Sequence, residues 1–207
     1  MCFTETHLDG LVLDNQLNIP GYSFFFRNDR NAHGGGVIIY FSDKLKAIRK
    51  PEFEPVSTEC IWAEVQCHNR NIMIGLFYRP PNSRNDFYRH LEWSLESVCD
   101  YSSEIVIFGD FNIDLTYPNS QLETIFHNYN LFNVILEPTR VTPTSATLLD
   151  PIFFSNTIKC LESGVFEVDS AVSDHKATYL IMSFSYNCKS TYVRHVWNYR
   201  RADFALF

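Results

Sequence analysis

Short apolar segments rich in β-branched and aromatic residues, separated by turn residues, constrain the fold of this chain most strongly. The run Ile105-Val106-Ile107-Phe108 contains no polar residue, which is typical of a strand buried on both faces. Segment 71–78 has the same character, and Pro80-Pro81 ends it because neither proline can donate a hydrogen bond to a neighbouring strand. The other strands that the pattern predicts are 37–41, 60–66, 148–155 and 177–184.

Helical spacing occurs in two segments between these strands. Residues 86–98 place four apolar side chains on one face, with Asp86 as the N-cap: Phe87, Leu91, Leu95 and Val98. A second helix is predicted over 120–129. Because strands outnumber helices and the two kinds are interleaved, we expect an α/β (α+β) fold. Its predicted form is a four-layer sandwich of two packed, mostly antiparallel β-sheets flanked by helices.

The pattern supports one domain over residues 1–185, followed by a polar and aromatic tail over 186–207. The chain has 207 residues, 45% of them hydrophobic, which is enough to bury one sizeable core. No apolar run approaches the roughly 20 residues of a membrane-spanning helix. The N-terminus lacks the basic and apolar segments of a secretory signal, so we expect an intracellular protein. The six cysteines are scattered without C-x-x-C pairs, which favours reduced thiols over disulfides or a zinc site.

The charge of the chain does not identify its partner. Proteins that bind DNA gain affinity by neutralising phosphates, so a net charge of -7 is unfavourable for that role. Acids that hold a cation would invert the local field, however. Basic residues gather in two groups that are equally well explained as ordinary solvated faces: Arg27, Arg30, Lys44, Lys46, Arg49 and Lys50, and then Arg194, Arg200 and Arg201.

The end of the apolar run at 105–108 is the first place that could carry chemistry. Gly109 allows the backbone to turn, and Asp110 and Asn112 can point the same way from an extended segment. A carboxylate can hold or deprotonate an attacking water, while an amide can donate to a phosphate oxygen without adding charge. An Asx-turn that closes the strand explains the segment equally well when it is taken alone.

Two further segments place polar residues next to predicted strands. Ser173-Asp174-His175 precedes the strand 177–184, and a histidine kept protonated by a carboxylate would complement a phosphate. Asp150 follows the apolar residues Leu148 and Leu149. Each segment has a plainer interpretation, as a surface turn and as a turn or cap acid. Glu5 near the N-terminus is unremarkable by itself.

Taken together and in this order, these segments resemble one protein family. They are Thr4-Glu5-Thr6, Gly34-Gly35-Gly36-Val37, Phe77-Tyr78-Arg79-Pro80-Pro81-Asn82, Gly109-Asp110-Phe111-Asn112, Thr147-Leu148-Leu149-Asp150 and Ser173-Asp174-His175. The chain resembles the endonuclease domain of non-LTR retrotransposons, from about Phe3 to Phe184. That domain belongs to the wider endonuclease/exonuclease/phosphatase family, which includes apurinic endonucleases, pancreatic-type deoxyribonucleases and inositol-polyphosphate phosphatases. Residues 195–203 of this chain are similar to the linker that leads from that endonuclease domain towards a reverse transcriptase.

The resemblance implies a role for each matching residue. Glu5 matches a magnesium-binding glutamate, and Asp174 would support the metal or the leaving group. Asp110 would orient or deprotonate the attacking water. His175 would stabilise charge on the phosphate, with Asp150 holding its imidazole. The resemblance implies that four further residues bind the substrate, with Tyr78 and Asn112 contacting its phosphate: Tyr78, Arg79, Asn112 and Thr147.

The implied reaction is attack of water on a DNA phosphodiester with Mg²⁺, or Mn²⁺, as the cofactor, leaving a 3′-hydroxyl that could prime reverse transcription. DNA is the implied partner, a reverse transcriptase domain is a further one, and the nucleus is the implied location. A family strand that carries a metal-supporting asparagine is expected to be missing ahead of Glu5. Two alternatives stay open, a phosphomonoesterase and a catalytically inactive relic or DNA-binding module of the same fold.

Overall fold

A computed structural model describes residues 1–67, 70–81, 83, 86–117 and 120–183. Its centre is a six-stranded sheet in the order β4-β5-β6-β7-β11-β8. In that order the strands are Ala47–Arg49, Glu59–Gln66, Asn71–Tyr78, Ile105–Asp110, Ile152–Ser155 and Leu131–Asn133. Only β6 and β7 pair in parallel, while the other neighbours in this sheet are antiparallel. The predicted strands 60–66, 71–78 and 105–108 therefore form the middle of the sheet.

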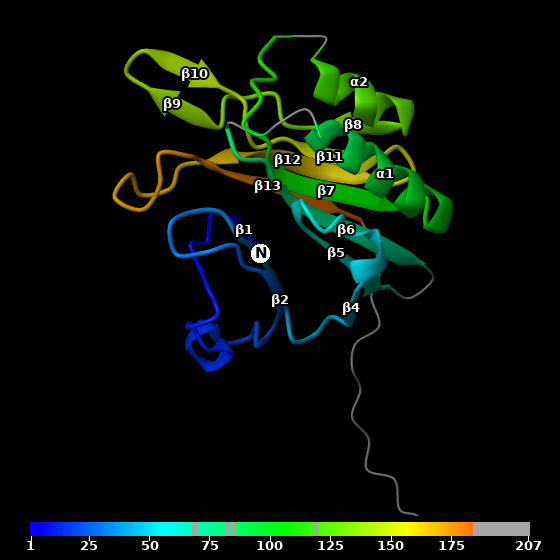
Figure 1. The fold of residues 1–207 in the computed structure, drawn as a ribbon. Helices are drawn as coiled ribbons and strands as arrows, with labels where there is room; N and C mark the ends of the chain where they lie inside the picture. The colour runs from blue at the N-terminus through cyan, green and yellow to red at the C-terminus, as the bar shows by residue number, and fades with distance from the viewer. Residues whose placement is uncertain (68–69, 82, 84–85, 118–119, 184–207) are drawn as a thin grey trace, which may run out of the picture.

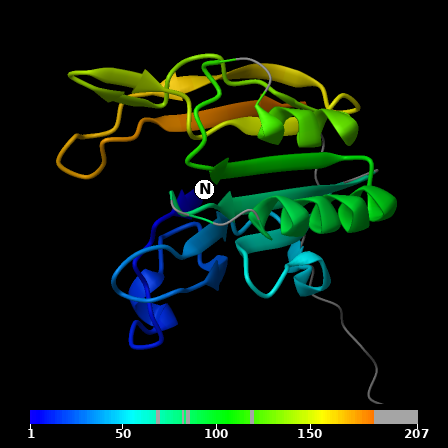
Figure 2. The same ribbon diagram turned by 45° about the horizontal axis from the view of Figure 1, so that its top comes forward.

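The parallel pairing of β6 and β7 depends on a helical crossover, because parallel strands cannot be joined by a tight hairpin. Helix α1 (Asp86–Tyr101) supplies it and lies lengthwise beside β7 (Figure 2). Its predicted apolar stripe is confirmed, since Phe87, Leu91, Leu95 and Val98 are all buried. Helix α2 (Gln121–Asn128) begins after Ser120, whose hydroxyl accepts a hydrogen bond from the backbone of Glu123 and so caps the helix.

Both helices cover the same face of the central sheet, and the ring of Phe111 contacts both of them. Its ring contacts Phe87 of α1 and Phe126 of α2, with ring centroids 6.3 and 5.7 Å away. It also contacts Phe77 of β6 and Phe153 of β11 at 6.3 and 6.2 Å. Phe111 is 0% exposed, so the segment that follows β7 is anchored in the core. This anchoring positions Asp110 and Asn112 on either side of it.

The opposite face of the central sheet is covered by a second layer in two pieces (Figure 1). One piece has the order β1-β3-β2, formed by Cys2–Thr4, Val37–Phe41 and Phe24–Asn28, and packs over β5, β6 and β7. The other is the hairpin of β12 (Cys160–Phe166) and β13 (Ala177–Met182), with β13 against β11. A separate hairpin joins β9 (Arg140–Thr142) to β10 (Ser145–Thr147). Short 3-10 helices are η1 (Asp14–Leu17) and η2 (Pro51–Phe53).

The predicted fold class, a mixed α and β protein with packed and mostly antiparallel sheets, is confirmed. The strand expected over 148–155 starts only at Ile152, because the backbone amides of Leu149 and Asp150 bond to the Thr139 hydroxyl and Pro151 has none. The strand expected over 177–184 ends at Met182. The tail 186–207 lies outside the described residues. Within them, no helix is long and apolar enough to cross a membrane.

Candidate active site

The site lies where β6 and β7 end. Because these strands are parallel, their last residues, Tyr78 and Asp110, are direct partners at one edge of the sheet. Gly109 pairs with Phe77, and a methyl group at position 109 would clash with the Phe77 carbonyl oxygen. Glycine is therefore required for the backbone of β7 to approach β6 this closely. The approach brings the carboxylate of Asp110 to the start of the loop.

Asp110 is a buried acid, with 4% of its surface exposed. Its Oδ1 accepts a hydrogen bond from the backbone amide of Asn112 at 2.9 Å. Burial raises the pKa of Asp110 to about 7, and the nearby negative charge of Asp150 adds to this effect. A carboxylate with this pKa is suited to accept a proton near neutral pH.

Asn112 holds the Asp110 carboxylate in place. It adopts a left-handed backbone conformation with φ of 48°, which asparagine tolerates better than most residues. Its Nδ2 donates to Oδ2 of Asp110 at 3.1 Å and to the carbonyl oxygen of Arg79 at 3.0 Å. Both amide protons are therefore engaged within the protein. In this arrangement Asn112 orients Asp110 and ties the loop after β7 to the end of β6.

His175 and Asp150 form the second part of the site. Nδ1 of His175 lies 2.8 Å from Oδ2 of Asp150. The same Asp150 oxygen accepts a hydrogen bond from the hydroxyl of Thr139 at 2.7 Å. Burial alone would lower the pKa of His175, but the hydrogen bond and charge of Asp150, together with other nearby acids, raise it above its usual value. Asp150 thus favours the imidazolium and leaves Nε2 available.

Glu5 and Tyr78 form the third part. Glu5 follows β1 directly and has a positive φ of 51°. The Tyr78 hydroxyl donates a hydrogen bond to Oε1 of Glu5. Burial and this bond to a carboxylate both raise the pKa of Tyr78, so its hydroxyl stays protonated and serves as a donor. The guanidinium of Arg30 lies over the Tyr78 ring, 5.9 Å from its centroid.

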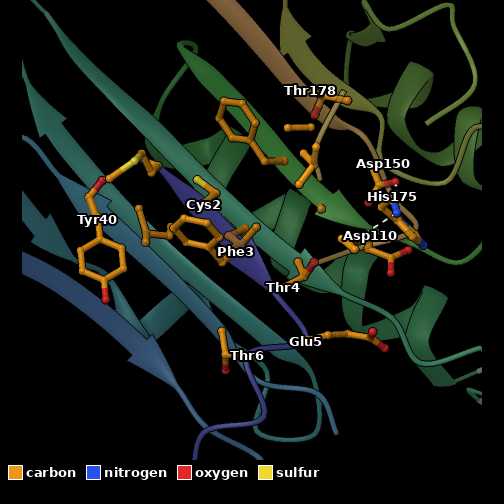
Figure 3. Close-up of a pocket in the computed structure, with 18 of the residues that line it drawn as sticks. Cys2, Phe3, Thr4, Glu5, Thr6, Tyr40, Asp110, Asp150, His175 and Thr178 are labelled. Carbon is orange, nitrogen blue, oxygen red and sulfur yellow. Dashed lines mark hydrogen bonds and ion pairs between the residues drawn. The ribbon is translucent and has the colours of Figure 1, made fainter. Parts of the chain in front are cut away.

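These parts meet in one cavity of about 1090 Å³ (Figure 3). Its lining includes five of the predicted site residues: Glu5, Asp110, Asp150, Asp174 and His175. Oxygen or nitrogen atoms of Asp110, Asp150 and His175 lie within 4.8 Å of one another. Figure 3 shows these three side chains together, with Glu5 reaching towards them from β1.

The donor set suits a hard divalent cation. Carboxylate oxygens are the preferred ligands of Mg²⁺ and Mn²⁺. Asp110 and Asp150 share a partly buried space, and burial first and the charge of Asp150 second raise the pKa of Asp110. A cation would relieve this repulsion. The chemistry of the residues therefore fits a metal site between the acids, and Glu5 faces the same space.

Asp174 occupies a different position from the other acids. Its Oδ2 accepts a hydrogen bond from Nε of Arg140 at 2.8 Å and forms an ion pair with Nη2 of the same residue at 2.7 Å. The bond to Arg140 lowers the pKa of Asp174, and 59% of its side chain is exposed. Asp174 is thus paired at the rim of the cavity rather than grouped with Asp110 and Asp150.

Four predicted residues are not among those that line the cavity: Tyr78 and Asn112, described above, and Arg79 and Thr147. The Arg79 guanidinium bonds the carbonyl oxygens of Phe111 and Ser83, at 3.4 and 3.3 Å, and lies over the ring of Phe87. Thr147 ends β10, and its carbonyl oxygen accepts from the amide of Thr139 at 2.9 Å. In this structure Arg79 braces the loop after β7, and Thr147 braces the segment that carries Thr139.

Sequence reasoning missed Thr139 and Arg140. Thr139 is 0% exposed and its hydroxyl bonds Asp150. Arg140 pairs with Asp174, and its backbone forms an isolated bridge to His175. The available signal was weak: a lone threonine and arginine after Pro138 have no periodicity or motif of their own. Only the fold, which brings residues 139–140 against 174–175, shows their role.

A model of the endonuclease/exonuclease/phosphatase family matches residues 1–175. The chain belongs to the endonuclease/exonuclease/phosphatase family. The match runs from β1 to His175, and it confirms the family that the sequence motifs predict. No curated protein matches the chain by sequence.

Several solved structures share the fold of this chain at low sequence identity. The endonuclease domain of TRAS1, a telomere-specific non-LTR retrotransposon, has a TM-score of 0.59 at 16% identity, with 81% of each chain covered. TDP2 of D. rerio, complexed with a single-strand DNA product, has 0.59 at 13%, covering 88% of this chain and 84% of that one. The 3′ phosphatase NExo from Neisseria, bound to a product DNA hairpin, has 0.63 at 14%, with 88% of each chain covered. Nucleases and phosphatases thus both occur among these structures.

Proposed function

We propose that this member of the endonuclease/exonuclease/phosphatase family is a divalent-metal-dependent DNA endonuclease that nicks one strand and leaves a 3′-hydroxyl. The convergence of Asp110, Asp150 and His175 within 4.8 Å carries this proposal. The buried carboxylate of Asp110, with its raised pKa, provides a proton acceptor. The imidazolium of His175, whose pKa is also raised, provides a positive charge for a phosphate.

In the proposed reaction, the oxygen of a water molecule attacks phosphorus and the bond from phosphorus to O3′ breaks. Asp110, oriented by Asn112, accepts a proton from the water. The imidazolium of His175, held by Asp150, stabilises negative charge on a phosphate oxygen through Nε2. The departing 3′-oxygen takes up a proton and becomes the 3′-hydroxyl.

The other site residues would bind and position. The Tyr78 hydroxyl orients Glu5, and on phosphate binding it is placed to donate to the substrate. Glu5, Asp110 and Asp150 would hold Mg²⁺ or Mn²⁺, and the bound ion would supply Lewis-acid stabilisation of the phosphate. Asp174 would contribute from the rim, where Arg140 now holds it.

The biological setting of this proposal is target-primed reverse transcription by a non-LTR retroelement in the nucleus, together with a reverse transcriptase. Support comes from the similarity in fold to the TRAS1 endonuclease domain and from the segment Phe77-Tyr78-Arg79-Pro80-Pro81, which resembles that branch. Nicks with 3′-hydroxyl ends would be direct primers for a polymerase.

A plasmid nicking experiment tests the proposal. Supercoiled plasmid is incubated with the chain in Mg²⁺, Mn²⁺ or EDTA, and the nicked circle is quantified. We expect metal-dependent nicking that falls by about 100-fold or more in Asp110→Asn and His175→Ala. Glu96→Gln, an exposed acid on α1, is the matched control and keeps full activity. Extension of the nicks by a DNA polymerase reports the 3′-hydroxyl. Absence of nicking in either metal would reject the proposal.

A phosphomonoesterase is the second candidate, because a 3′ phosphatase and a mannosyl-6-phosphatase are among the similar solved structures. The same residues would serve that reaction. Two substrates separate the candidates: a DNA duplex with a 3′-phosphate at a nick, and an intact duplex. Release of inorganic phosphate from the first with no cleavage of the second would favour the phosphatase.

A further inference from the structure

A run of three glycines, 34–36, comes directly before strand β3, and we call it the triglycine segment. Gly35 and Gly36 adopt positive φ values of 71° and 86°, a conformation that other residues rarely take. A methyl group on Gly35 would overlap the carboxylate of Glu59 and the guanidinium of Arg30. These two side chains therefore pack directly on the glycine backbone.

The backbone around Glu5 is held by the triglycine segment. Strand β1 pairs with β3 in a regular register up to Thr4 and Val37. If this register continued, Glu5 would lie opposite Gly36, but the carbonyl oxygen of Gly36 instead accepts from the amide of Thr6 at 3.2 Å. Glu5 is thus an extra residue, as in a β-bulge, and its φ is 51°. A residue other than glycine keeps such a conformation only where its surroundings enforce it.

Glu59 and Arg30 hold the triglycine segment from its other side. Oε2 of Glu59 accepts a hydrogen bond from the amide of Gly36. Oε1 of Glu59 accepts from Nη1 of Arg30 at 2.9 Å. Nε of Arg30 donates to the carbonyl oxygen of Gly34 at 2.8 Å. Because the Glu59 side chain is only 16% exposed, these bonds are partly protected from competing water.

The same two side chains also reach Tyr78. Glu59 is the direct partner of Tyr78 in the pairing of β5 with β6, and the Arg30 guanidinium lies over the Tyr78 ring. The Tyr78 hydroxyl in turn donates to the carboxylate of Glu5. The Glu59–Arg30 pair thus supports Glu5 twice. The triglycine segment links the pair to the Glu5 backbone, and Tyr78 links it to the Glu5 carboxylate.

We propose that Arg30 and Glu59 are positioning residues that hold Glu5 where it binds the divalent cation. The inference rests on the proposed function, in which Glu5 is a ligand of that metal. A bulged residue can direct its side chain to the cavity only while the triglycine segment keeps Thr6 in place. Glu59 fixes that segment by bonding its last amide, and the planar guanidinium of Arg30 fixes the orientation of Glu59.

A second pair of the same construction provides a matched control. Glu54 accepts from Nη2 of Arg49 at 2.7 Å and from the backbone amide of Trp62 at 2.9 Å. Arg49 also donates to the carbonyl oxygen of Arg27 at 2.9 Å. These bonds join β2, β4 and β5 rather than the triglycine segment. Each pair combines one guanidinium with one backbone amide, so breaking the second pair costs similar contacts at a different place.

The affinity of the chain for Mn²⁺ tests the inference without relying on catalysis. Free Mn²⁺ is followed by electron paramagnetic resonance as protein is added. Glu59→Gln keeps the shape of the side chain but places an amide donor against Arg30. We expect the dissociation constant to rise about tenfold or more in Glu59→Gln and Arg30→Ala, as for other residues that orient metal ligands. Glu54→Gln and Arg49→Ala should bind Mn²⁺ as the wild type does.

Three results of this titration would overturn the inference. They are wild-type affinity in Glu59→Gln, an equal loss in Glu54→Gln, and an absence of Mn²⁺ binding by the wild type. Failure of the proposed function looks different. A wild type that binds Mn²⁺ but does not nick plasmid rejects the nuclease and leaves the positioning role in place.

A double-mutant cycle tests whether Glu59 acts through Glu5. Glu5→Gln weakens Mn²⁺ binding by removing the charged ligand itself. Glu59→Gln should therefore weaken binding no further when it is combined with Glu5→Gln, because the residue that it positions is already gone. If the two losses multiply in the double variant, Glu59 affects the metal by another route and the positioning role is rejected.

Amide hydrogen exchange followed by NMR reports the backbone part of the support. The amides of Thr6 and His7 donate to carbonyl oxygens of the triglycine segment, at 3.2 and 2.9 Å. We expect both amides to exchange at least about tenfold faster in Glu59→Gln than in the wild type, and at the wild-type rate in Glu54→Gln. Unchanged exchange of both amides in Glu59→Gln contradicts the inference.

Discussion

Oδ2 of Asp150 lies 2.8 Å from Nδ1 of His175 and also accepts the hydroxyl of Thr139 at 2.7 Å. This one oxygen joins three segments that are far apart in the chain: the residues before β11, those before β13 and those before β9. The ring orientation and the charge of His175 therefore both depend on Asp150. Four consequences of the site geometry can be measured.

Asp150→Asn should weaken catalysis by changing the charge state of His175. An asparagine oxygen can still accept from Nδ1, but the loss of the negative charge lowers the pKa of His175. We expect nicking to fall by about 10- to 100-fold, as for other residues that orient a catalytic histidine. The basic limb of the pH–rate profile should move to lower pH. A reduced rate with an unmoved basic limb would mean that Asp150 acts on structure alone.

Thr139→Val should reduce both stability and activity. The substitution keeps the shape of a side chain that is 0% exposed but removes three hydrogen bonds, to Asp150 Oδ2 and from the amides of Leu149 and Asp150. We expect a loss of about 2–4 kcal/mol in the free energy of unfolding, measured by urea denaturation. Thr139→Ser keeps the hydroxyl and should restore nicking, at a stability cost of about 1 kcal/mol for the lost methyl group. Equal activity of the valine and serine variants would contradict this role.

Gly109→Ala should disrupt the end of β7. A methyl group there would meet the carbonyl oxygen of Phe77 on the paired strand, and neither backbone can move without breaking the sheet. We expect the free energy of unfolding to fall by about 3 kcal/mol or more, with loss of nicking. Gly10→Ala is the matched control, since no atom lies within 4 Å of the added methyl group there. A Gly109→Ala protein as stable as Gly10→Ala would refute the packing argument.

The parts of the fold that the sequence predicts are those with a strong local pattern. The apolar run at 105–108 and the stripe from Phe87 to Val98 were placed correctly because burial on two faces, or on one helical face, leaves a period in the sequence. The short strands β1, β9 and β10 contain no buried residue, so they leave no such period in the sequence. The meeting of Asp110 with Asp150 and His175 depends on long-range strand pairing, so only the family motifs pointed to it.

The same limit explains the details of the site. The pairing of Asp174 with Arg140 and the hydroxyl of Thr139 depend on the loop ahead of β9 lying against the segment ahead of β13. The carbonyl oxygen of Thr139 fixes this contact by accepting from the amide of Lys176 at 2.7 Å. Backbone hydrogen bonds of this kind do not depend on which side chains are present, so no pattern of residues in the sequence predicts them.

Asp110→Asn should stabilise the metal-free chain at high pH while it removes activity. The pKa of Asp110 is raised from 3.8 to about 7, so the folded state holds this proton more tightly than the unfolded state. The contribution of Asp110 to stability is therefore fully present below pH 3.8 and is lost as pH rises through about 7. Asparagine does not titrate, so the variant escapes this loss.

The thermal unfolding of wild type and Asp110→Asn in EDTA, at about pH 4 and about pH 8, measures the difference. We expect the variant to gain about 2–4 kcal/mol over the wild type between the two conditions. Glu96→Gln, on the exposed face of α1, should follow the wild type at both pH values. Saturating Mg²⁺ should shrink the advantage of the variant, because a cation next to the ionised carboxylate offsets both the cost of burying that charge and its repulsion by Asp150. A difference that does not change with pH would show that Asp110 is already ionised well below neutral pH, and would remove it as the proton acceptor.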